Sequence, residues 1–271
     1  MKVGLYYADD AKLNGPSKGV SNLIRGLDMI GVQVEPNKTL DMNGCMQGWI
    51  AQDILSLPES TLMGPNLVNM PGENPGMWHR YHSYVFRSIY LANHYAQYVG
   101  TKNRNLNVWY GGIDTDRFKP EGERSLDCLV YFKRRPEKDL EIACAVLKDK
   151  GLSYEVLSYG SYTEEDFIRL SRKAKFCLMV NAGEGFGHAS FEMWSMNLPT
   201  YILHFNEFHG PTAPVFSPKC GIVCDDFSRF DEFLGKVGSF TPREFVLDGF
   251  TLKEGAQRYF SHLVQAHWGF I

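Results

Sequence analysis

The sequence contains no run of 18 apolar residues, and its opening segment, MKVGLYYADD, has a strand-like pattern instead of a basic stretch followed by an apolar one. The first absence argues against a transmembrane helix, and the second against a secretion signal. We therefore expect a protein without a transmembrane segment that stays in the cytoplasm.

A surplus of charge of one sign is also missing. The chain has 28 Lys and Arg against 31 Asp and Glu, a formal net charge of −3, and its sequence pI is about 6.2. Because a nucleic-acid-binding surface needs an excess of positive charge, this balance argues against a nucleic-acid partner, although a local basic patch stays possible.

Cysteines are few and follow no metal-binding pattern. The six cysteines are scattered, and several stand within apolar runs, which is typical of reduced, buried thiols. Cys220 and Cys224 are separated by three residues, but no second Cys or His pair has zinc-finger spacing. We therefore expect no metal site.

The sequence does contain strand-like and helix-like segments in alternation, which predicts parallel sheets covered by helices on both faces. Its 271 residues, 44% of them hydrophobic, suffice for one large core or two compact domains. A polar stretch with proline and glycine at 107–124 indicates a domain boundary. The expected strands are 2–8, 32–36, 60–71, 127–132, 154–160, 175–180 and 199–203, and the expected helices are 20–31, 136–151, 163–174, 188–196, 227–236 and 251–266.

A glycine-spaced segment follows one of these strands. The apolar run KFCLMV (175–180) predicts a buried strand, and HASFEMWSM (188–196) has helical spacing with one broad apolar face. Gly183, Gly185 and Gly187 between them therefore predict a strand-to-helix turn.

The chemistry of this turn suggests a ligand. Glycines let backbone N–H groups approach a ligand, and a helix N-terminus favours negative charge. Glu184 within the turn would repel a bare phosphate, but a carboxylate accepts hydrogen bonds from hydroxyl groups. The turn therefore suggests a phosphate linked to a sugar.

Several motifs of the second half resemble the donor-binding domain of retaining, nucleotide-sugar-dependent glycosyltransferases of the GT-B fold, family 4. EGFGHASFE (184–192) matches the family's Glu-x7-Glu motif, and NLP (197–199) stands where Gly-x-Pro is expected. YGGIDTDRFKP (110–120) is similar to the family's boundary strand, and FKRRPEK (132–138) has the spacing of its Arg-x4-Lys pair. YGSYTEEDFIRLSRKAKF and TAPVFSPKCGIV resemble a compact branch from large algal viruses and some bacteria. The resemblance spans roughly 107–265 and is much weaker in the first half.

The resemblance implies an α/β fold of the GT-B type, with two Rossmann-like domains whose parallel sheets face each other across a cleft. We expect a reduced acceptor-side domain over 1–117, a nucleotide-sugar donor domain over 118–250, and a C-terminal helix over 251–271 that crosses back to the first domain. The implied reaction moves a sugar from a donor such as a UDP- or GDP-sugar to a hydroxyl of a glycan or another acceptor, with retention and without a metal or cofactor. The implied location is the cytoplasm, or the host cytoplasm if the source is viral, and the oligomeric state stays open.

The resemblance also assigns roles to single residues. Glu192 is expected at the ribose hydroxyls and Glu184 at the donor sugar, while Lys133 and Lys138 neutralise the leaving diphosphate. In the alternative interpretations, Glu192 is a solvated helix glutamate and Glu184 is only a partner of the helix dipole. Lys133 replaces the family's usual arginine, so Arg134 is a shifted alternative for gripping phosphate. The remaining donor-binding candidates are Gly185, Phe186, Gly187 and His188 in the second half, and Gly15, Lys18 and Gly19 in the first.

Two features of the first half allow more than one interpretation. NGPSKGV (14–20) resembles the glycine loop that approaches the diphosphate from the acceptor side, but a simple strand-to-helix turn explains it equally well. One histidine of the first domain is often near the donor sugar in this family, and the spacing does not select among His79, His82 and His94.

Rival functions belong to other classes. A reductase or epimerase is disfavoured because no Gly-x-Gly-x-x-Gly follows the first strand. A catalytically silent sugar-nucleotide-binding subunit stays possible, as does a transferase that acts on modified DNA bases, which salt-sensitive DNA affinity would support.

Overall fold

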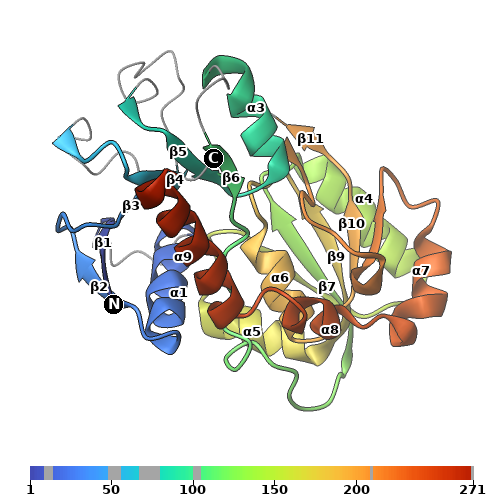
Figure 1. Cartoon of the computed structure of the whole chain (residues 1–271). Coiled ribbons are helices and arrows are strands. Elements are labelled where there is room, and N and C mark those ends of the chain that lie inside the picture. The colour runs from blue at the N-terminus through green and yellow to red at the C-terminus, as the bar shows by residue number, and fades with distance from the viewer. Residues whose placement is uncertain (9–14, 48–55, 67–79, 100–104, 208–209, 270–271) are drawn as a thin grey trace. The chain divides into compact units, whose positions relative to one another are not determined.

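The computed structural model describes residues 1–8, 15–47, 56–66, 80–99, 105–207 and 210–269 (Figure 1). The chain divides into two compact units, a first unit of Met1–Gly112 with Phe250–Ile271 and a second unit of Ile113–Gly249. Each unit has its own parallel sheet with helices packed on it, which confirms the predicted α/β class.

The first unit contains a six-stranded parallel sheet in the order β2-β1-β3-β4-β5-β6. His79 and the predicted loop residue Asn14 lie outside the described residues. The strands are β1 (Lys2–Tyr6), β2 (Gln33–Pro36), β3 (Asn43–Gln47), β4 (Leu62–Asn66), β5 (Ser83–Phe86) and β6 (Asn105–Val108), and the helices are α1 (Gly15–Met29), α3 (Ile89–Val99) and α9 (Leu252–Trp268).

Both faces of this sheet are buried, and successive side chains along a strand point to opposite faces. Along β5, Val85 packs in the core shared with α1 and α9, whereas its neighbours Tyr84 and Phe86 pack in the core shared with α3. This is the two-residue period of a strand that is buried on both sides. Figure 1 shows α1 and α9 side by side, and Tyr259 of α9 stacks edge-on against Trp109 at 5.1 Å.

The predicted loop at 14–20 is wrong from Gly15 onward, because α1 already begins there. Pro16 does not prevent this start, since proline lacks only an N–H that is unpaired in the first helical turn anyway. Lys18 and Gly19 are therefore helical residues, not part of a glycine loop.

The second unit contains a five-stranded parallel sheet in the order β13-β10-β9-β7-β8 and a short antiparallel hairpin, β11-β12. The strands are β7 (Leu126–Lys133), β8 (Tyr154–Ser158), β9 (Ala174–Asn181), β10 (Thr200–Leu203), β11 (Asn206–Glu207), β12 (Gly210–Pro211) and β13 (Gly221–Cys224). The α-helices are α4 (Glu137–Asp149), α5 (Glu164–Lys173), α6 (His188–Ser195), α7 (Phe230–Lys236) and α8 (Pro242–Leu247), and the 3-10 turns are η3 (Pro218–Cys220) and η4 (Val237–Ser239).

This second sheet is also covered on both faces. Val130 of β7 and Leu178 of β9 share a core with α4 and α7. On the opposite face, Tyr131 contacts Phe167 of α5, and Met179 accepts a weak hydrogen bond from Ser190 of α6. The chain therefore places helices α5 and α6 on one side of the sheet and α4 and α7 on the other, as Figure 1 shows.

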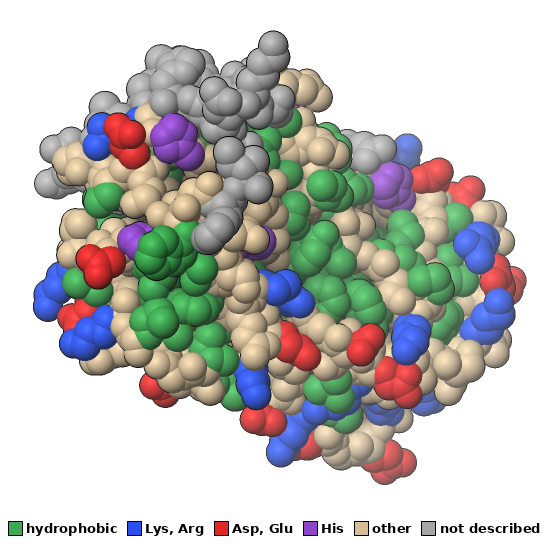
Figure 2. All heavy atoms as spheres, in the orientation of Figure 1, with side chains coloured by type: hydrophobic (Ala, Val, Ile, Leu, Met, Phe, Trp, Pro, Cys, Tyr) green, Lys and Arg blue, Asp and Glu red, His purple; other side chains and the backbone are tan. Residues whose placement is uncertain are grey.

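Helix ends in both units follow local sequence signals. Thr163 caps α5 in a reciprocal capping box with Asp166. Thr251 and Glu254 form the same arrangement at the start of α9. None of the described helices is long and apolar enough to cross a membrane. Positive and negative side chains are interspersed on the face drawn in Figure 2, in keeping with the small net charge.

Candidate functional site

The candidate site is the carboxyl edge of the second sheet, where β7 and β9 end side by side. Lys133, the last residue of β7, is in register with Asn181, the last residue of β9. Ala182 N–H donates to the Lys133 carbonyl at 2.9 Å, so the segment after β9 leaves the sheet next to Lys133. Ligands of open α/β sheets bind at this edge.

The glycine-spaced segment is a strand-to-helix turn, as predicted. Gly187 caps α6 with φ of 87° and ψ of 53°, a left-handed conformation that residues with a Cβ seldom adopt. The first N–H groups of α6 have no carbonyl partner within the helix and carry its positive dipole end. The Phe186 side chain is buried and stacks on Phe191 at 4.4 Å, so at Phe186 only the backbone is left to contact a ligand.

Lys133 and Glu184 meet at this edge. The Lys133 Nζ lies 2.6 Å from Glu184 Oε1, and the two side chains are only 16% and 14% exposed. The ammonium also lies 4.7 Å from the ring centre of Tyr159, on the segment after β8. The structure thus brings two of the predicted catalytic residues into one sheltered ion pair.

The other predicted cations lack such partners. Arg134 is exposed, has a positive φ of 53° and approaches the Tyr159 ring at 5.7 Å. Lys138 is exposed on the first turn of α4, and neither cation has a carboxylate partner among the described residues. Arg135, in contrast, bonds to Asp139 at 2.6 Å and covers the Phe205 ring at 4.2 Å. Arg134 and Lys138 are therefore the cations that stay available to an anion.

Glu192 lies on α6 and is only 4% exposed. The alternative of a solvated helix glutamate is therefore wrong, because a glutamate on a solvated face keeps most of its side chain in water. A carboxylate buried this deeply must be satisfied by hydrogen bonds.

Sequence reasoning missed other residues of this edge. Asn181 is fully buried, and its Oδ1 has no hydrogen-bond partner within the described parts of the chain. Tyr131 is buried nearby. Its burial is the main reason why the pKa of its phenol is raised, and the neighbouring Tyr162 and the charge of Glu184 raise it further. Asn181 could have been noticed, since it directly follows the apolar run that predicts β9.

Three of the candidates in the first unit have contacts within that unit. Gly19 is packed against Arg87, because a Cβ at Gly19 would lie 2.3 Å from Arg87 Nη2. His82 is exposed near Glu59, with a 3.9 Å separation, and His94 on α3 meets the Tyr95 ring edge-on. None of these contacts identifies one histidine as a ligand-binding residue.

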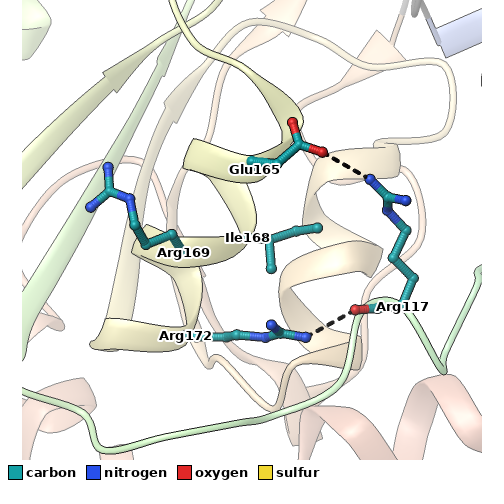
Figure 3. Close-up of a pocket in the computed structure, with 5 residues that line it drawn as sticks. All are labelled: Arg117, Glu165, Ile168, Arg169 and Arg172. Carbon is teal, nitrogen blue, oxygen red and sulfur yellow. Dashed lines mark hydrogen bonds and ion pairs between the residues drawn. The ribbon is translucent and has the colours of Figure 1, made fainter.

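A surface pocket of about 520 Å³ lies elsewhere in the second unit (Figure 3). The pocket does not include any of the predicted site residues, and its arginines are already bonded within the protein. Arg117 pairs with Glu164 at 2.6 Å and Glu165 at 3.3 Å, and Arg172 pairs with Glu121 at 2.8 Å. The lining residues are Arg117, Glu165, Ile168, Arg169 and Arg172.

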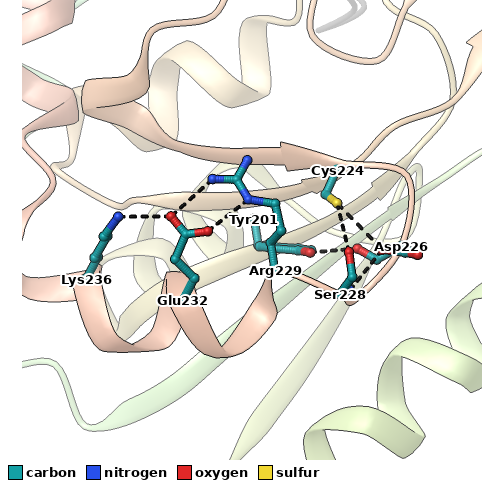
Figure 4. Close-up of polar contacts among 7 residues, drawn as sticks. All are labelled: Tyr201, Cys224, Asp226, Ser228, Arg229, Glu232 and Lys236. Atoms are coloured by element: carbon teal, nitrogen blue, oxygen red, sulfur yellow. Dashed lines mark hydrogen bonds and ion pairs between the residues drawn. The ribbon is translucent and has the colours of Figure 1, made fainter.

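Cys224, one of the two cysteines separated by three residues, lies in a polar cluster next to α7 (Figure 4). Cys224 contacts Asp226 and Ser228, while Cys220 is buried. Tyr201 donates to the Asp226 carbonyl at 2.6 Å. Among the described residues, no group of three or more His, Cys, Asp or Glu could hold a metal ion.

Several solved structures share the fold of the whole chain. A sucrose-phosphate synthase from Thermosynechococcus elongatus is similar with a TM-score of 0.65 at 10% identity, over 99% of both chains. The lipopolysaccharide outer core galactosyltransferase WaaB, in its apo form, has a TM-score of 0.63 at 11% identity, over 100% of both chains. An alpha-glucosyltransferase in complex with UDP and a 13-mer DNA containing an HMU base has a TM-score of 0.52 at 9% identity, over 98% of this chain and 95% of that one.

These similarities, together with the two parallel sheets, confirm the predicted GT-B fold. No protein-family model and no curated protein matches the sequence. At such low identities the structural neighbours establish the fold alone.

Proposed function

We propose that the protein is a glycosyltransferase that moves a sugar from a nucleoside-diphosphate sugar to an acceptor hydroxyl. The observation that carries this proposal is the carboxyl edge of the second sheet, where the sheltered pair of Lys133 and Glu184 adjoins the exposed cations Arg134 and Lys138. Carboxylates suit sugar hydroxyls, and cations suit a diphosphate, so one edge offers both halves of such a donor.

The positive groups would stabilise the leaving group. When the bond between C1 of the sugar and the diphosphate oxygen breaks, its electron pair goes to the diphosphate. Lys138 and Arg134 supply positive charge for this pair, and Lys133 moves from Glu184 toward the phosphate. The first N–H groups of α6 add the positive end of the helix dipole.

The carboxylates would hold the hydroxyl groups of the donor. Glu184 accepts hydrogen bonds from the sugar once Lys133 turns to the phosphate. Glu192 accepts hydrogen bonds from the ribose hydroxyls, a task that suits a carboxylate sheltered from water. The backbone groups of Gly185, Phe186, Gly187 and His188 lie between these acids in the chain and contact the sugar or phosphate.

The narrower parts of the proposal come from the family resemblance. We propose a compact enzyme similar to family 4, acting in the cytoplasm without a metal or cofactor on a donor such as a UDP- or GDP-sugar. The acceptor oxygen bonds to C1 on the face from which the diphosphate departs, so the configuration is retained, and the acceptor proton passes to the leaving phosphate oxygen. The first unit serves the acceptor, and α9 packs within that unit.

The test is a screen of nucleotide sugars that measures release of the nucleoside diphosphate. Each donor is tested without an acceptor and then with sugars, glycans or DNA containing modified bases as acceptors. We expect one donor to be hydrolysed slowly and transferred faster when a suitable acceptor is present. NMR of the product would give the anomeric configuration. Donor binding without turnover on any acceptor would support a silent subunit, and no binding to any nucleotide sugar would refute the proposal.

A further inference from the structure

A buried arginine in the first unit has no role in the site described above. Arg87 directly follows β5, so it lies at the carboxyl edge of the first sheet, and its side chain is only 6% exposed. Burial lowers the pKa of its guanidinium to about 10, and the nearby Tyr259 opposes this only in part. Because that pKa is still well above neutrality, Arg87 is a buried positive charge.

The described residues around Arg87 do not supply a negative charge to compensate its own. The guanidinium lies 5.0 Å from the ring centre of Trp109, and its Nη2 is 3.5 Å from Asn66 Oδ1 at the end of β4. No carboxylate among the described residues pairs with it. Arg87 Nη1 and Asn66 Nδ2 are both buried donors without a hydrogen-bond partner in the described structure. Two neighbouring buried donors and a charge with no carboxylate partner among the described residues favour an anionic ligand as their acceptor.

Helix α1 favours the same kind of ligand. Arg87 Nη2 would be only 2.3 Å from a Cβ at Gly19, so the guanidinium is packed against the N-terminal part of this 15-residue helix. Glycine is the residue that allows this approach. The positive end of the helix dipole attracts an anion. Arg87, Asn66 and α1 thus converge at the edge of the sheet where open α/β folds bind ligands.

We propose that Arg87 and Asn66 bind a phosphate or carboxylate group of the acceptor. The assignment to the acceptor rests on the proposed function, whereas the anion site itself does not. The second unit already supplies Lys133, Arg134 and Lys138 for the diphosphate of the donor, which leaves the cation of the first unit for another anion. A guanidinium binds phosphate and carboxylate in the same bidentate manner, so both groups fit its chemistry.

The anion site is tested by measuring the Tm of thermal unfolding in the presence of inorganic phosphate. Sodium chloride of equal ionic strength is the control for the effect of salt. Phosphate can also bind at the exposed donor cations, so all proteins carry Arg134→Gln and Lys138→Gln. Asn66→Asp places a carboxylate where Oδ1 now approaches Arg87. This second variant keeps the test decisive if Arg87→Gln fails to fold. Arg25→Gln, which removes an exposed charge from α1, is the matched control.

The reference is the protein that carries only the background substitutions at the donor cations. We expect phosphate to raise the Tm of this reference and of Arg25→Gln. Asn66→Asp should have a higher Tm without phosphate and an apparent phosphate affinity at least tenfold weaker, because its own carboxylate occupies the guanidinium. Arg87→Gln should lose the phosphate response. The site would be overturned if phosphate raised the Tm of Asn66→Asp as much as that of the reference. It would also be overturned if phosphate did not raise the Tm of the reference.

The acceptor assignment is tested by kinetics with a hexose, its phosphate and its uronic acid as acceptors. We expect the protein to prefer one of the two anionic acceptors, which identifies phosphate or carboxylate as the group recognised. Asn66→Asp should raise KM for that acceptor at least tenfold relative to KM for the neutral hexose. Equal use of all three acceptors, unchanged by Asn66→Asp, would overturn the assignment. A protein that hydrolyses no donor would instead contradict the proposed function, and the phosphate titration would still decide the anion site.

Discussion

Lys133 Nζ lies 2.6 Å from Glu184 Oε1, although the two residues are 51 positions apart in the chain. The register of β7 with β9 produces this approach, because it sets Lys133 opposite Asn181 and starts the glycine turn beside it. The two charges satisfy each other in a sheltered place. A donor that separates them must offer phosphate to the lysine and hydroxyl groups to the glutamate.

Glu184→Gln should therefore have opposite effects on two ligands. Without the carboxylate, Lys133 is free for phosphate, so we expect affinity for the nucleoside diphosphate to increase about tenfold, which corresponds to about 1.4 kcal/mol. Turnover of the nucleotide sugar should decrease, because the sugar loses its carboxylate. Calorimetric titration and a hydrolysis assay measure the two effects. A lower affinity for the nucleoside diphosphate would show that Glu184 does not compete for Lys133.

Lys138→Gln should weaken binding of the nucleoside diphosphate about tenfold at low salt, and less as salt rises, because the lost interaction is between exposed charges. Lys148→Gln is the matched control, since Lys148 is in the last turn of the same helix. Equal effects of both substitutions would indicate a general charge effect and no phosphate contact at Lys138.

Gly187→Ala should destabilise the second unit by about 1–2 kcal/mol, the cost of a left-handed conformation for a residue with a Cβ. The nearest atom to that Cβ would be Ser190 Oγ at 3.5 Å, so the cost is conformational and not steric. Gly235→Ala in α7 is the control, because its Cβ meets nothing within 4 Å and alanine favours helix. Denaturant unfolding measures both. An unchanged stability of Gly187→Ala would mean that the turn relaxes freely.

The lowered pKa of Asp127 predicts how the stability of the fold decreases in acid. Asp127 accepts hydrogen bonds from Lys175 and Ser153, which lower the pKa of its carboxyl to about 2. A lowered folded-state pKa stabilises the fold above the unfolded value of about 3.9, and this contribution is lost as the pH falls toward 2. Asp127→Asn should reduce stability at pH 6 and flatten its decrease between about pH 4 and pH 2. Glu123→Gln, which removes an exposed acid of the same unit, is the control.

Local patterns made much of the second unit predictable. The apolar run at 175–180, the glycines after it and the capping signal at Thr163 each act within a few residues, and the structure has β9, the turn and α5 there. The loop expected at 14–20 failed because a proline and two glycines are compatible with the start of a helix as well as with a turn.

Features that depend on distant residues were not predictable. The burial of Glu192 depends on what packs against α6, and its helical spacing alone does not distinguish a buried glutamate from a solvated one. Arg87 lies in a segment without a motif, and its importance arises only where β4, β5 and α1 meet. Long-range contacts of this kind follow from strand order, which a single sequence does not specify.

The most direct test of the donor site is calorimetric titration of the nucleoside diphosphate and its sugar conjugate into the protein and into Glu192→Ala. Glu165→Ala serves as control, since Glu165 is exposed on α5 in the same unit. We expect both ligands to bind the unaltered protein and the control alike, and Glu192→Ala to bind both at least tenfold more weakly, because each ligand carries the ribose. Equal affinities in all three proteins, or no binding of any nucleoside diphosphate or nucleotide sugar, would contradict a donor site at the carboxyl edge of the second sheet.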